Sequence, residues 1–249
     1  CNKMGSGKEE INQNNNYKMK QGFTHTRKKV RQIVSRFMVL SLLAMCTGGT
    51  LMAQGTEPID SDNDGRLEIA NKQPLLYLSE NPNAVLSADY EQTSDIVFTD
   101  ADFQPGGDFY NNGKGFNPIG EYNFYNRFSG TYRGQNHKIE GLYINRPEQS
   151  TVGFFGGAVP NLISNLHIID ADIRGNDRVG ALIGIATSQY GEENEVRHCT
   201  ASGIIESTGR FVGGLIGSNQ AVVDSCHSDV VLPNTDAQYM GGLIGTTSG

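Results

Sequence analysis

The carboxyl-terminal third of the chain contains three six-residue blocks that end in the same way. They are Val179–Gly184, Val212–Gly217 and Met240–Gly245, and a shorter relative, Gly153–Gly156, precedes them. The closing glycines of the four blocks lie 28, 33 and 28 residues apart. Repetition at this period is typical of a solenoid, in which each repeat forms one turn that stacks on its neighbours.

Aligning the repeats by these glycines predicts which side chains stack in columns. The two predicted columns are Leu166, Cys199 and Cys226, and Leu182, Leu215 and Leu243. The segments between them are short, rich in β-branched residues and bounded by Gly, Asn, Asp or Ser, which favours strands over helices. The sequence therefore predicts an all-β fold, a parallel β-solenoid over residues 128–249. We expect the block glycines to lie at corners that require positive φ.

Residues 71–127 differ from the repeats and are predicted to form a small α+β amino-terminal cap. A short helix is expected over residues 72–79 with Asn71 as its N-cap, followed by irregular strands that cover the open end of the solenoid. Aromatic residues cluster here, and we expect most to form the core of the cap. The members to test for exposure, as a platform for sugar stacking, are Tyr122, Phe124 and Tyr125.

The opposite end of the predicted solenoid has no cap in the sequence. The chain stops four residues after Gly245, the last residue of the fourth block. Because a solenoid needs a cap at each end, we expect the repeats to be truncated at the carboxyl end.

Charge divides the chain into two unequal parts. Residues 1–53 contain 9 Lys and Arg against 2 Asp and Glu, whereas residues 54–249 contain 11 against 25, a formal charge of 11 − 25 = −14. A surface this acidic repels nucleic acid and anionic lipid. We therefore expect no nucleic-acid partner for the later part.

The basic segment has the order of a secretory signal peptide. Arg27–Lys29 precede the apolar run Phe37–Cys46, and Ala53 precedes a polar stretch, as expected for a charged region, an apolar region and a cleavage site. Cleavage after Ala53 is favoured; the alternative is a lipobox ending at Cys46, whose acylation would anchor the protein to a membrane. Residues 1–53 are interpreted as a spurious leader, with a start at Met19, plus a signal peptide.

The sharpest candidate site is an acidic stretch in the linker at residues 54–70. Three carboxylates at alternate positions of a loop, followed by a glycine, form the first half of a calcium loop, because Ca²⁺ prefers hard oxygen ligands. A complete EF-hand is not expected, since the twelfth position is Asn71 instead of Glu. The predicted ligands are Asp60, Asp62, Asp64, the carbonyl of Arg66, and Glu68. The alternative is a solvated acidic linker.

The repeats contain no convergent set of catalytic or metal-binding residues by this alignment. His167 and His227 are predicted to lie two turns apart, about 9.6 Å, which is too far to share a zinc ion. No two carboxylates face each other on neighbouring turns, as a glycosidase site would require. Asp172 is predicted to lie opposite Ile205.

Two further pairs are predicted from the same alignment. Arg197 and Asp224 align, and we expect them to form an outward ion pair of little energetic weight. Cys199 and Cys226 stack on adjacent turns and are predicted to be free thiols that act as small apolar side chains.

The blocks Gly214–Gly217 and Gly242–Gly245 resemble the GLUG motif, a short repeat of bacterial surface and secreted proteins that also occurs in some IgA-cleaving metallopeptidases outside their catalytic part. The segment Phe128–Leu142 resembles the turn that opens such arrays, and the resemblance extends over about residues 116–249. Ala181 departs from the first glycine of the motif. The resemblance implies a right-handed β-solenoid used as a surface-exposed stalk or adhesin module, without catalytic residues in this portion.

The predicted function is therefore that of an exported, non-catalytic, adhesin-like module that binds an extracellular protein or glycan. The alternative is the accessory solenoid region of a larger secreted enzyme, either a metallopeptidase or a polysaccharide-active protein. We expect the protein to contact a membrane only through its signal peptide or through a lipid attached to Cys46. Calcium is the expected cofactor, with a structural role.

Overall fold

The computed structural model describes residues 55–249 except residues 82, 124, 189–193, 234–236 and 248–249. The expected leader, signal peptide and Cys46 therefore lie outside the described residues, as does Phe124. The described residues belong to one structural unit. None of the helices in this part of the chain is long and apolar enough to cross a membrane.

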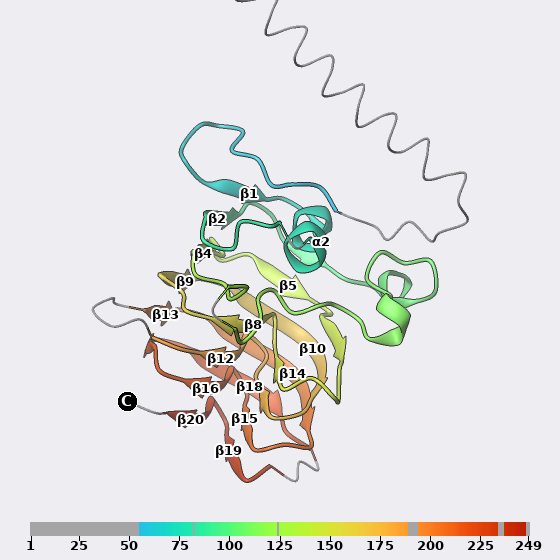
Figure 1. The fold of residues 1–249 in the computed structure, drawn as a ribbon, viewed down its shortest axis with the longest axis vertical. Helices are drawn as coiled ribbons and strands as arrows, with labels where there is room; N and C mark the ends of the chain where they lie inside the picture. The colour runs from blue at the N-terminus through green and yellow to red at the C-terminus, as the bar shows by residue number, and fades with distance from the viewer. Residues whose placement is uncertain (1–54, 82, 124, 189–193, 234–236, 248–249) are drawn as a thin grey trace, which may run out of the picture. The chain divides into compact units, whose positions relative to one another are not determined.

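In the described residues, four sheets run along a stack of strands, and every pairing between their strands is parallel (Figure 1). The first sheet contains β1 (Leu67–Ile69), β2 (Asp89–Gln92), β4 (Thr131–Arg133), β9 (Leu162–Ser164), β13 (Glu195–Arg197) and β17 (Val222–Asp224). The second contains β3 (Ile96–Val97), β5 (Lys138–Glu140), β6 (Tyr143–Asn145), β10 (His167–Gly175), β14 (Thr200–Ser207) and β18 (His227–Val231). The third contains β7 (Thr151–Val152), β11 (Arg178–Val179), β15 (Phe211–Gly213) and β19 (Tyr239–Gly241). The fourth contains β8 (Phe155–Ala158), β12 (Ile183–Ala186), β16 (Ile216–Asn219) and β20 (Ile244–Thr247).

The chain visits these sheets in a fixed order, so that each circuit is one turn of a solenoid. One turn, for example, uses β9, β10, β11 and β12 before β13 returns to the first sheet. The third and fourth sheets each contain four strands, so about four turns are described. The predicted all-β parallel solenoid is therefore confirmed.

The strand register confirms both predicted columns. Val196 pairs with Ile163 on one side and Val223 on the other, which places Cys199 between Leu166 and Cys226. Ile216 pairs with Ile183 and Ile244, which places Leu215 between Leu182 and Leu243. The column members on the inner turns are fully buried and belong to one continuous apolar core, which supplies the main stabilising term of such a fold.

The block glycines are explained by close backbone approach, which corrects the expectation of positive φ. None of the closing glycines has a positive φ. A Cβ atom on Gly184 would lie 2.8 Å from the carbonyl oxygen of Gly156, one on Gly217 would lie 2.7 Å from that of Gly184, and one on Gly245 would lie 2.6 Å from that of Gly217. The backbone of each turn therefore packs directly against the backbone of the previous turn at this glycine. Any side chain there would push the strands of the two turns apart.

This glycine column begins one turn earlier than the sequence blocks indicate. A Cβ atom on Gly156 would lie 2.5 Å from the carbonyl oxygen of Gly120, and Ile119 forms a parallel bridge with Phe155. Gly120 thus occupies the same position as the closing glycines, although no block surrounds it.

Residues other than glycine occupy one corner that does need positive φ. Asn165, His198 and Ser225 lie at the turn between the first and second sheets, with φ of 52°, 52° and 50°. Asn and His tolerate the left-handed region better than most residues, and a single position there costs little within a strong core. His198 is therefore an exposed corner residue.

A β-bulge in β10 corrects the predicted alignment of Asp172. Ile168 pairs with Ala201 but Ala171 pairs with Gly203, so β10 contains one extra residue at this point. Asp172 consequently lies opposite Ile204, not Ile205. The effect of the extra residue on the alignment ends within the same turn. Arg178 pairs with Phe211, which is the pairing expected if β10 contained no bulge.

The bulge also determines which charges meet on the outer face. It aligns Arg174 with Glu206, and their side chains form an ion pair at 2.9 Å that the sequence alignment did not predict. Arg197 and Asp224 do align, but Arg197 forms its ion pair with Glu195, at 3.5 Å on the same strand. The predicted Arg197–Asp224 pair is thus replaced by a local one.

The segment before the repeats contains the expected helix and also extends the solenoid sheets. Helix α2 spans Lys72–Glu80, and the side chain of Asn71 accepts a hydrogen bond from the backbone N–H of Gln73, as an N-cap does. In β2, Tyr90 pairs with Tyr132 of β4, so the first sheet continues into residues 71–127.

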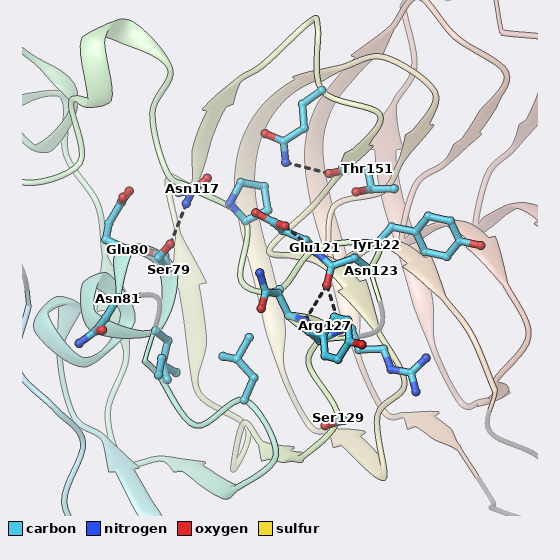
Figure 2. Close-up of a pocket in the computed structure, with 18 of the residues that line it drawn as sticks. Ser79, Glu80, Asn81, Asn117, Glu121, Tyr122, Asn123, Arg127, Ser129 and Thr151 are labelled. Carbon is cyan, nitrogen blue, oxygen red and sulfur yellow. Dashed lines mark hydrogen bonds between the residues drawn. The ribbon is translucent and has the colours of Figure 1, made fainter.

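Most of the aromatic cluster forms the core of this region, as predicted. Phe116 and Phe154 stack with ring centroids 5.5 Å apart, and the fully buried Tyr132 packs edge-on against Phe154. Tyr122 and Tyr125 are the exceptions, at 60% and 90% exposed. Figure 2 shows Tyr122 extending from its loop over the strands of the solenoid.

The glycine column predicts a sharp contrast between two substitutions in the same motif. Gly217→Ala places a Cβ atom 2.5 Å from the backbone nitrogen of Val179, and we expect a loss of about 1–3 kcal/mol in the free energy of unfolding. Gly242→Ala is the matched control, because a Cβ atom there has no neighbour within 4 Å. Urea unfolding of both variants measures the difference, and equal stabilities would contradict this account of the column.

Candidate functional site

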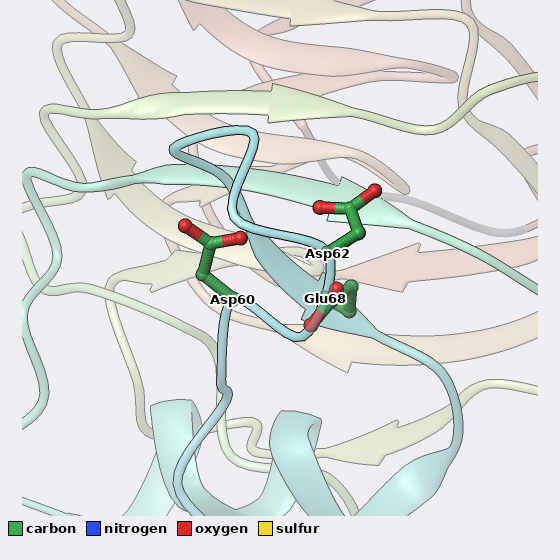
Figure 3. Close-up of side chains that lie close together, drawn as sticks. All are labelled: Asp60, Asp62 and Glu68. Atoms are coloured by element: carbon green, nitrogen blue, oxygen red, sulfur yellow. The ribbon is translucent and has the colours of Figure 1, made fainter.

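The acidic stretch forms a loop that leads into β1 and gathers three of its carboxylates. One oxygen atom from each of Asp60, Asp62 and Glu68 lies within 4.8 Å of the others. Figure 3 shows Asp60 and Asp62 on the loop and Glu68 on the strand that follows it. Pairing of β1 with β2 fixes the position of Glu68, so the solenoid edge holds one side of the cluster.

Hydrogen bonds to the loop backbone hold the carboxylates in place. Asp60 accepts hydrogen bonds from the backbone N–H groups of Asp64 (3.1 Å) and Gly65 (3.0 Å). Glu68 accepts from the hydroxyl (2.7 Å) and backbone N–H (2.8 Å) of Ser61, and these bonds lower the pKa of Glu68. Gly65 has a φ of +90°, which favours glycine at this turn.

Asp64 and Arg66 of the acidic stretch also pair with each other. The Arg66 guanidinium pairs with Asp64 at 2.6 Å and with Glu91 of β2 at 3.4 Å. Asp62, Asp64 and Glu91 form a second group of carboxylates with oxygens within 4.8 Å of one another. The predicted residues are therefore close together, but Arg66 contributes a positive charge beside Asp64.

Glu91 is the member of the cluster that the sequence did not indicate. It lies 23 residues after Glu68, and the parallel register of β1 and β2 pairs the two residues directly. Neighbouring like charges on paired strands are destabilising unless a cation compensates them. Arg66 supplies this positive charge for Glu91, and the side-chain amide of Gln135 donates a hydrogen bond to Glu91 at 3.2 Å. No local motif marks Glu91, because its position depends on tertiary pairing.

The donor set around Asp62 fits a hard divalent cation. Carboxylate oxygens are the ligands that Ca²⁺ prefers, and those of Asp60, Asp62 and Glu68 are close enough to share one ion. In addition, Oε2 of Glu68 is buried and has no hydrogen-bond partner among the described residues. A cavity of about 580 Å³ adjoins the cluster, with Glu57, Asp62, Glu68 and Glu91 in its wall. These residues would hold the ion and leave room for water ligands.

Calcium is expected to stabilise the protein through Asp60, Asp62 and Glu68. At a free concentration one hundred times the dissociation constant, the gain is about 2.7 kcal/mol, or about 5–10 °C in Tm. Titration calorimetry and thermal unfolding measure binding and stability together. We expect Asp62→Ala to abolish both effects and Asp64→Ala to weaken them less, because Asp64 is paired with Arg66.

The matched control for this prediction is Asp100→Ala, which removes an exposed carboxylate outside the loop. This variant should keep the full response to calcium. An Asp62→Ala protein that responds like the Asp100→Ala protein would show that the loop is a solvated acidic linker.

The two cysteines of the described region are free thiols on adjacent turns, as predicted. The backbone nitrogen of Cys199 lies 3.4 Å from Sγ of Cys226. The hydrogen bond between the thiols, together with burial, raises the pKa of Cys199 well above its usual range, whereas the same bond lowers the pKa of Cys226. Cys226 therefore loses its proton first, and it is also the less buried of the two.

This difference predicts the order of alkylation. Iodoacetamide should modify Cys226 first in the folded protein and Cys199 only after denaturation, because the thiolate is the reactive form. Mass spectrometry of the two peptides under non-reducing conditions measures the order. A disulfide-linked peptide, or earlier modification of Cys199, would contradict the free-thiol assignment.

The register of two repeat histidines agrees with the alignment. His167 and His227 both align with Thr200, so they lie two turns apart. His167 Nδ1 lies 2.8 Å from the hydroxyl of Thr200, and burial lowers the pKa of His167. These side chains belong to the sheet surface and to its corners.

Comparisons with known proteins identify one similar sequence. Halomucin from Haloquadratum walsbyi is 33% identical over 109 residues, which cover 43% of this chain and 1% of Halomucin. The chain therefore spans a very small part of the length of that protein. No family model and no solved structure matches the chain.

Proposed function

We propose that this protein is an exported surface-interaction module, adhesin-like and non-catalytic in the portion described. The observation that carries the proposal is how the solenoid uses its charged side chains. Arg174 pairs with Glu206, Arg210 with Asp177, and Lys138 with Glu140, all on outer faces of the stack. Partly exposed ion pairs of this kind contribute little to stability and leave charged groups in contact with water, which suits a solvated interaction surface.

Two further observations support export and a role at a surface. Residues 54–249 carry a formal charge of −14, which suits solubility outside the cell, and the preceding segment has the residue order of a signal peptide. The partner we propose is an extracellular protein or glycan. Calcium at the acidic loop would serve the module structurally, by neutralising carboxylates at the first turn.

A second candidate function is that of an accessory solenoid within a larger secreted enzyme. The comparison with Halomucin favours keeping this candidate, because the matched 109 residues make up 1% of that protein. A segment of this kind can thus occur as a small part of a very long chain. In this case the solenoid would position or target a catalytic domain encoded elsewhere in the same protein.

The location is tested by labelling intact cells with antibodies raised against the chain. We expect labelling of intact cells, and its loss after brief treatment with an external protease. Labelling that requires permeabilised cells would contradict the proposed surface location.

The interaction role is tested with the purified chain on an array of glycans and extracellular matrix proteins. We expect at least one saturable signal that heat denaturation of the chain removes. An array that stays silent with the folded chain would contradict an interaction function.

A further inference from the structure

We propose that the cleft between the end of α2 and residues 120–123 and 125–127 binds an uncharged oligosaccharide. This inference rests on the proposed surface-interaction function and names its ligand class and site. The cleft has a volume of about 950 Å³, near the upper end of the range for small-molecule sites, about 300–1,000 Å³. It is thus large enough for several sugar units.

The two walls of the cleft are held in fixed positions. One wall contains Ser79, Glu80 and Asn81 at the end of α2, and the other contains the loop residues 120–123 and 125–127 (Figure 2). The side-chain amide of Asn117 donates a hydrogen bond to the carbonyl of Ser79, at 2.7 Å, and so ties α2 to the segment that leads into this loop. A ligand would therefore meet a cleft that already exists.

The loop is preorganised by its own hydrogen bonds. Oδ1 of Asn123 accepts from the backbone N–H groups of Tyr125 (2.9 Å) and Asn126 (2.8 Å), and Nδ2 donates to Glu121 at 2.7 Å. The backbone N–H of Glu121 donates to the carbonyl of Asn126 at 2.9 Å, which closes the base. Preorganisation lowers the entropic cost of binding, so even a small contact area can give measurable affinity.

Two exposed tyrosines, Tyr122 and Tyr125, line the cleft, and Figure 2 shows the ring of Tyr122 pointing over the strands of the solenoid. Tyr122 is 60% exposed although the Arg178 guanidinium lies over its ring at 5.7 Å, and Tyr125 is 90% exposed. The other aromatic residues of this region are mainly buried, so these two are exceptions to the pattern that surrounds them. Rigid aromatic rings next to hydrogen-bonding groups supply a stacking surface for the apolar face of a sugar ring at low entropic cost.

The remaining lining explains why the ligand is polar and uncharged. Amide and hydroxyl groups predominate, including those of Asn81, Asn126 and Ser129, and they can both donate to and accept from sugar hydroxyls. Two acids, Glu80 and Glu121, are balanced by two bases, Arg127 and Arg146. The cleft is thus neutral within a strongly acidic protein, so the surrounding field disfavours anionic glycans.

The test is titration calorimetry of the purified chain with cellohexaose, laminarihexaose, maltohexaose and mannohexaose. An oligogalacturonate of the same length is the anionic comparison. We expect binding of at least one neutral hexasaccharide and none of the oligogalacturonate. Tyr122→Ala and Tyr125→Ala should each weaken the neutral interaction about tenfold. Because both side chains are exposed, neither substitution should change the thermal unfolding curve.

The matched control is Tyr239→Ala, which removes a tyrosine of similar exposure, 48%, on β19 outside the cleft. It should leave sugar binding unchanged. Silence with all four neutral sugars, preference for the oligogalacturonate, or equal effects of the three tyrosine substitutions would overturn the cleft assignment. If the chain binds a protein on the array but none of the four neutral sugars, this inference is overturned, whereas the proposed surface-interaction function stands.

Discussion

The contact between successive closing glycines sets the geometry on which the rest of the structure depends. The column begins at Gly120, and each of its later members, Gly156, Gly184, Gly217 and Gly245, lies against the carbonyl oxygen of the one before it. Because the backbones touch there, the fourth sheet fixes the spacing of the turns. The other sides of the solenoid then have room for irregularity. The bulge in β10 is accommodated in this way, and the register of the fourth sheet continues without change.

The glycine column also explains which parts of the fold could be predicted from the sequence. The glycine blocks served as a reference point, so the columns built on Leu182 and Leu166 were correct, as was the helix after Asn71. The physical reason for the glycines was wrong, because a close approach between turns cannot be distinguished from a positive φ in one sequence. The alignment of Asp172 was also wrong, since a bulge adds a residue without leaving any motif. Gly120 was missed because its turn lacks the block.

The acidic loop and the cleft also differ in how far the sequence could predict them. The acidic loop was found because Asp60, Asp62 and Glu68 lie within one short stretch of sequence. Glu91 was not found, because parallel pairing brings it to the loop from β2. The cleft could not be predicted either, since its walls come from the end of α2, the loop before Phe128 and the turn before β7. Both sites lie before or at the first turns, whereas the repeats contribute the regular stack that supports them.

The pairing of Glu68 with Glu91 has a further consequence for how a solenoid and an ion fit together. Parallel strands repeat at about 4.8 Å, which is close to twice the usual calcium–oxygen distance of about 2.3–2.6 Å. Acids in register on successive turns can therefore approach one ion, and Asp62 belongs to the carboxylate groups of both Glu68 and Glu91. An ion in this position would act as a clamp between turns, beside β1, which is the edge strand of the first sheet in the described residues. Acidic pairs in register would then protect an end of the solenoid that hydrogen bonding alone leaves incomplete.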